Sequence, residues 1–126
     1  MPTLLRDSHF VLERYDAPAF VRLARTAEPL TTQAQPERSL LACRGALGEL
    51  DPGALGILID WRLSPQAAAS DAIEQAAVRE VEAFAAQFAR GAVLLLTAAA
   101  PAWSHARVKV FRDEEAAIAY TSGTSC

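Results

Sequence analysis

Two short apolar runs on either side of one long amphipathic pattern constrain the fold of this chain more than any other feature. The first run, Leu55–Ile59, is followed by Asp60-Trp61-Arg62, and the second covers residues 91–97. Between them, apolar side chains recur at helical spacing from about Asp71 to Arg90. Buried strand, crossover helix and buried strand form a βαβ unit of a parallel sheet that is covered on both faces. The sequence therefore predicts an α/β fold.

An antiparallel hairpin is expected before this unit. Residues 10–15 and 20–25 alternate partly between apolar and polar side chains, and a proline-containing turn at 16–19 separates them. Four charged residues make the pair more polar than the later strands, which predicts a position near the edge of the sheet. They are Glu13, Arg14, Arg22 and Arg25.

The remaining elements complete a single domain over residues 1–126. A helix is expected from Pro36 to about Leu50, with Cys43 on its apolar side, and Gly91 fits the left-handed residue that closes the long helix. A last strand over 107–111 and a short helix from Asp113 to about Tyr120 follow. We expect a single mixed, mostly parallel sheet of about five strands with helices packed on it, and flexible ends at 1–8 and 121–126.

Composition excludes several classes of function. The net charge of −3 comes without a basic stripe, which disfavours nucleic acid, and no apolar run approaches the length of a membrane span. The N-terminus meets a charge pair too early for a signal peptide, so we expect a cytoplasmic protein. Cys43 and Cys126, without a paired histidine, predict reduced thiols; neither a metal nor a cofactor is expected.

Several short motifs, taken in order, resemble the STAS-like superfamily of anti-sigma-factor antagonists, and more closely its bacterial STAS/SEC14-like group. They are Ile59-Asp60-Trp61-Arg62, Pro65, Asp71, Phe88-Ala89-Arg90, Ala92-Val93-Leu94, Val110-Phe111 and Asp113-Glu114-Glu115-Ala116-Ala117. The resemblance implies a small regulatory or adaptor domain for signalling that binds a protein, or a lipid or nucleotide, without catalysis. The chain lacks the Asp-Ser-Ser-Gly-like turn of the phosphorylated antagonists, and an alanine-rich piece replaces the basic helix of the SEC14-like members.

The candidate binding residues follow the strands of the βαβ unit, because ligands of parallel sheets favour the carboxyl ends of the strands. We expect Trp61 and Trp103 to act as anchors and Arg62 as a polar contact. In the alternative interpretation, Trp61 packs under a helix and Trp103 holds a loop in place. The complete candidate set is Asp60, Trp61, Arg62, Ser64, Ser70, Trp103 and His105.

Other polar residues allow weaker hypotheses. Ser64 and Ser70 are candidates for phosphorylation by position, although Ser70 also fits a helix cap. His9 and His105 titrate near neutral pH, but no nucleophile motif accompanies them, which favours surface histidines. The acidic residues 113–115 suit a helix N-terminus without a cation.

Three functions remain open from the sequence. The leading hypothesis is a non-enzymatic domain that acts through protein–protein interaction. The alternative is a carrier of a lipid or other small apolar ligand, which needs a cavity between a helix and the sheet, and the third is a small enzyme. The hairpin edge and the last strand also leave open a homodimer formed by strand pairing.

Overall fold

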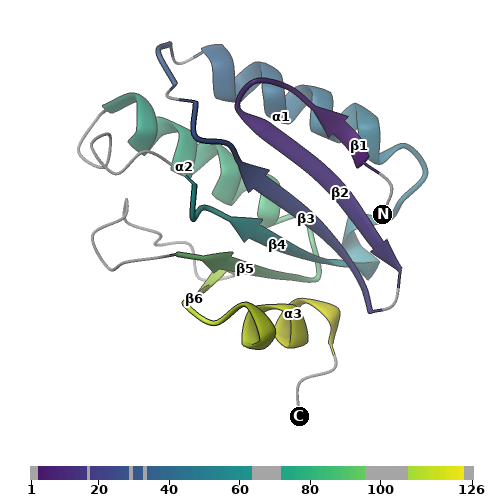
Figure 1. The fold of residues 1–126 in the computed structure, drawn as a ribbon. Coiled ribbons are helices and arrows are strands. Elements are labelled where there is room, and N and C mark those ends of the chain that lie inside the picture. The colour runs from purple at the N-terminus through teal and green to yellow at the C-terminus, as the bar shows by residue number, and fades with distance from the viewer. Residues whose placement is uncertain are drawn as a thin grey trace.

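A single mixed sheet organises the part of the chain that a computed structural model describes, namely residues 3–16, 18–28, 30–32, 34–63, 72–95 and 108–123. Its six strands have the order β1-β2-β3-β4-β5-β6, so each strand pairs with the next one along the chain (Figure 1). The first two pairings are antiparallel and the last three are parallel. The predicted α/β fold, with its N-terminal hairpin and mostly parallel sheet, is confirmed.

Within the described ranges, three helices connect or follow the strands. The strands are β1 (Thr3–Arg6), β2 (Phe10–Asp16), β3 (Ala19–Arg25), β4 (Gly56–Asp60), β5 (Arg90–Leu94) and β6 (Val108–Phe111). The helices are α1 (Ala34–Leu47), α2 (Ala72–Ala85) and α3 (Glu114–Ser122), and a 3₁₀ turn, η1 (Pro52–Ala54), precedes β4.

Helices cover the two faces of the sheet unequally (Figure 1). One face packs against α1 and α2 in a large core that includes Cys43, Val81 and Phe84. The other face packs against α3 in a smaller core around Leu58 and Ala117. Every residue of β4 is buried because this strand has a helical layer on each side, which explains its unbroken apolar run.

Close packing of α3 depends on a glycine at the start of β4. A Cβ atom on Gly56 would lie 1.8 Å from the backbone oxygen of Thr121, so only glycine admits the helix at this distance. Thr121 is fully buried and its hydroxyl donates to Ala117 O within α3. The terminal helix α3 ends at Ser122, two residues beyond its expected end at Tyr120 and within the segment expected to be flexible.

The N-terminal end of the sheet differs from the expectation. Thr3–Arg6, within the segment expected to be flexible, forms β1 and pairs with β2, so the sheet has six strands. A break in register between Thr3 and Leu5 brings both Leu4 and Leu5 against the large core, which removes the alternation that would have marked a strand.

The hairpin consequently lies next to the edge strand β1, which agrees with its predicted position near the edge of the sheet, but its own strands are interior and do not form the edge. The edges are β1 and β6, whereas β2 and β3 have neighbours on both sides. Arg25 is fully buried, with its guanidinium 5.8 Å from the Phe10 ring centroid and 5.1 Å from that of Trp61. Its charge indicated an edge in the sequence, but aromatic rings accommodate it inside the core.

The end of the long helix also differs from the expectation. The α2 helix ends at Ala85 and not near Arg90, and Gly91 is a buried residue of β5. The positive φ angles among the described residues belong to Gly48 and Gly123, directly after α1 and α3. Cys43 does lie on the buried side of α1, where burial, with the nearby Asp7 charge, raises the pKa of its thiol to about 12.

Candidate functional site

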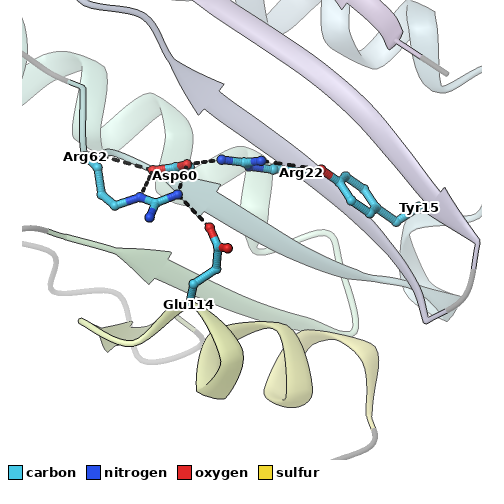
Figure 2. A network of polar contacts seen from close by, with 5 residues as sticks. All are labelled: Tyr15, Arg22, Asp60, Arg62 and Glu114. Atoms are coloured by element: carbon cyan, nitrogen blue, oxygen red, sulfur yellow. Dashed lines mark hydrogen bonds and ion pairs between the residues drawn. The ribbon is translucent and has the colours of Figure 1, made fainter. Parts of the chain in front are cut away.

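Five polar side chains meet where β4 ends, on the face of the sheet that α3 covers (Figure 2). We call this group the Asp60 cluster: Tyr15, Arg22, Asp60, Arg62 and Glu114. Asp60 is the last residue of β4, Arg22 comes from the neighbouring strand β3, and Glu114 lies in the first turn of α3. The cluster thus joins two parallel strands to the helix that packs over them.

Asp60 is the centre of the cluster. Its Oδ1 accepts from the backbone N of Arg62 at 3.1 Å and from Arg62 Nε at 2.9 Å. Its Oδ2 accepts from Arg62 Nη2 at 2.9 Å and from Arg22 Nη2. The Asp60 side chain is only 7% exposed, so two guanidinium groups and a backbone N–H take the place of water around the carboxylate.

This environment fixes the ionisation of the cluster. Burial alone would raise the pKa of Asp60, but the hydrogen bonds from Arg62 and Arg22 outweigh it and lower this pKa to about 2. The Asp60 carboxylate in turn raises the pKa of Arg62. Partial burial lowers the pKa of Arg22, but its hydrogen bonds to Tyr15 and Asp60 raise it overall. Asp60 is therefore ionised at neutral pH, with its oxygens engaged, and its chemistry is that of an anchor for arginines.

The outer contacts of the cluster are more open to solvent. Arg62 Nη2 also donates to Glu114 Oε2 at 2.6 Å, and the Glu114 side chain is 45% exposed. Arg22 Nη1 donates to Tyr15 Oη at a long 3.4 Å. The contacts at the rim of the cluster are therefore more exposed to solvent than those around Asp60.

A pocket opens beside the cluster. Its volume is about 340 Å³, and Arg22, Asp60, Arg62 and Leu63 line it. Leu63 is 63% exposed, so a large apolar side chain lies next to two cationic groups at the surface. Such a pocket can hold a group that combines negative charge with an apolar body.

The predicted candidate residues divide into three sets. Asp60 and Arg62 lie together in the cluster. Trp61 points to the opposite face of the sheet, as the alternation of side chains along a strand requires, and is 3% exposed against Phe10, with ring centroids 6.2 Å apart. This is the position that the packing alternative describes for Trp61. Ser64, Ser70, Trp103 and His105 lie outside the described residues, and phosphorylation at Ser64 or Ser70 stays a prediction.

Sequence reasoning missed Arg22, Tyr15 and Glu114 as members of the site. Arg22 and Asp60 are 38 residues apart in the chain, and only the register of β3 on β4 brings them together. A signal was nevertheless present, because Arg22 alternates with Phe20 and Ala24 on one face of a predicted strand. A cation on an otherwise apolar face requires a carboxylate nearby, and Asp60 follows the next buried run.

Comparison with known proteins assigns no family to the chain. No protein-family model, curated protein or solved structure matches the chain. None of the helices that the structure describes combines the length and apolar character required to cross a membrane. The functional assignment therefore depends on the fold and on the Asp60 cluster.

Proposed function

We propose that this chain is a non-enzymatic, STAS-like regulatory or adaptor domain that acts by binding another protein. The order of elements supports the proposal, since after β1 the chain runs strand, strand, helix, strand, helix, strand, strand, helix. This is the order of elements that the sequence predicts between residues 10 and 120, and the motifs that resemble the STAS-like superfamily fall along it. We expect such a domain to work in signalling in the bacterial cytoplasm.

One observation carries the proposed mode of action: Arg62 and Leu63 are held at the surface directly after a rigid, buried strand. The Arg62 side chain is 32% exposed, and its two hydrogen bonds to the Asp60 carboxylate restrict its conformations. A side chain that is ordered before binding loses less conformational entropy when a partner docks. Arginine beside an exposed apolar side chain is also a common combination in protein interfaces. Trp61 supports this surface from the core and is not itself a contact.

Affinity capture from a lysate of the source organism tests the proposal. We expect Arg62→Glu and Leu63→Asp to lose a protein that the unaltered chain captures. Leu41→Asp is the matched control, because Leu41 is 69% exposed on α1, which covers the other face of the sheet. Circular dichroism should show that all three variants fold.

Equal capture by all four proteins would contradict the proposed surface. Native mass spectrometry of the purified chain provides the second readout. A retained lipid or other apolar molecule, without a captured protein, would favour the alternative of an apolar-ligand carrier.

A further inference from the structure

The Arg62 guanidinium has hydrogen-bond donors that the described residues do not use. Its Nε and Nη2 donate to Asp60 and Glu114. Its Nη1 has no hydrogen-bond partner within the described ranges, and Figure 2 shows the remaining terminal nitrogen directed away from Asp60. A guanidinium edge with free N–H groups is suited to the oxygens of a carboxylate or phosphate.

Arg22 is also incompletely satisfied. Its Nε is buried and has no hydrogen-bond partner in the part of the chain that the structure describes, and its contact with Tyr15 is long at 3.4 Å. Both arginines line the pocket, and Asp60 is the one anion among the described residues that line it. Two positive charges and one negative charge leave this inner part of the cluster with a net charge of +1.

Glu114 supplies the missing negative charge from the rim. Its carboxylate contacts the same Arg62 nitrogen that binds Asp60, but the two side chains of this ion pair are both partly exposed, Arg62 by 32% and Glu114 by 45%. Exposed ion pairs of this kind contribute little and exchange readily with other ions. Glu114 therefore marks where an anionic group is held, and a ligand of the same charge can replace it.

We propose that the pocket is an oxyanion-binding site in which Arg62 and Arg22 hold a carboxylate or phosphate group and the ligand displaces Glu114 from Arg62. The site goes beyond the proposed function, because a small free anion can occupy it without any partner protein. The apolar side of the pocket, at Leu63, would contact the body that carries the anionic group.

Nuclear magnetic resonance of the arginine side chains tests the site directly. The ¹⁵N-labelled protein is titrated with inorganic phosphate and, separately, with acetate, at constant ionic strength maintained with chloride because added salt alone weakens such contacts. We expect saturable shifts of the Arg62 and Arg22 Nε–Hε resonances. The tighter of the two anions indicates whether the natural group is a phosphate or a carboxylate.

Two glutamates that follow each other in α3 provide a matched pair of variants. Glu114→Gln removes the internal competitor, and we expect it to bind the anion roughly threefold more tightly. Glu115→Gln removes the same charge from the same helical turn, where the structure gives Glu115 no contact with Arg62, and we expect a smaller gain. Arg62→Lys keeps the charge but loses the fork of donors, and we expect binding to weaken by about tenfold.

Shifts that grow linearly without saturation would overturn the site. So would an Arg22 Nε–Hε shift that saturates at the same anion concentration in Arg62→Lys, where the Arg62 resonance itself is absent and Arg22 is the reporter. An equal gain in both glutamine variants would do the same, because it would reduce the effect to overall charge. None of these readouts involves a partner protein, so failure of the site and failure of the proposed protein–protein function can be told apart.

Discussion

Two consecutive residues at the end of β4 serve opposite layers of the molecule. Asp60 faces the α3 side, where it organises two arginines, and Trp61 faces the large core. The backbone N–H of Trp61 donates to Leu94 O at 3.0 Å, so the alternation of the strand continues through this pair. The same short motif therefore contributes one residue to the candidate site and one to the stability of the fold.

Replacement of Asp60 by asparagine should destabilise the protein in a pH-dependent way. The pKa of Asp60 is about 2 in the folded chain against an ordinary 3.8. A lowered folded-state pKa stabilises the fold above the ordinary pKa, and this contribution is lost as the pH falls through about 2. We expect Asp60→Asn to lower the free energy of unfolding by roughly 2 kcal/mol at neutral pH.

Urea unfolding of both proteins at neutral pH and again near the folded-state pKa measures this difference. The difference in the free energy of unfolding between the unaltered chain and Asp60→Asn should shrink in acid, because Asp60 of the unaltered chain is then itself becoming protonated. A gap of constant size would mean that the carboxylate charge does not stabilise the fold. Asp16→Asn is a suitable control, because Asp16 pairs with Arg14 at an exposed position of β2.

The sequence predicted the part of the site that is local in the chain. Asp60 and Arg62 are two residues apart after a strand that the apolar run made evident. Arg22 lies 38 residues from Asp60, and Glu114 lies 52 residues from Arg62. Their positions in the cluster depend on the register of the strands and on where α3 packs on the sheet. A single sequence carries no information on register beyond the apolar pattern, which is why the polar partners were missed.

At the scale of elements, continuous patterns were predicted well and interrupted ones were not. The buried runs of β4 and β5 and the alternation of β2 and β3 are visible in the sequence because packing on the sheet requires them. The bulge of β1 hides its two leucines. Helix ends were less predictable, because a glycine near a helix can be a cap, as Gly48 is, or a strand residue, as Gly91 is.

The two glycines near the end of α1 should respond to alanine in opposite directions. Gly45 lies inside the helix and Gly48 follows it at φ +57°, and a Cβ at either position meets nothing within 4 Å. An added methyl group therefore gains or loses no side-chain contact at either position. The two substitutions should differ only through the backbone conformation at each position. We expect Gly45→Ala to raise the free energy of unfolding by about 0.5–1 kcal/mol and Gly48→Ala to lower it by about 1 kcal/mol.

Thermal or urea unfolding of the two single variants and the double variant measures these effects. The double variant should lie close to the unaltered chain if the two contributions add. Destabilisation by Gly45→Ala would instead show that α1 requires a small residue there for a contact outside the described residues.

For the whole molecule, the unequal helical layers imply unequal local stability. The large core holds α1 and α2 with fully buried aromatic residues such as Phe84 and Phe88. On the other face, α3 has nine residues, of which Ala117 and Thr121 are buried, whereas Ile118 and Tyr120 are only partly buried. An element with less buried apolar contact opens at a lower free energy, so we expect α3 to open without unfolding of the sheet.

Native-state hydrogen exchange distinguishes this behaviour from a single cooperative unit. The amides of α3 should exchange through an opening that depends weakly on urea, whereas those of β4 should exchange only with global unfolding. Phe84→Ala, which removes a fully buried ring from the large core, should lower the global free energy by about 3–4 kcal/mol. It should speed exchange in β4 while leaving α3 nearly unchanged. Equal acceleration of both elements would show that α3 and the sheet unfold together. Displacement of Glu114 from Arg62 would then have to occur without local opening of α3.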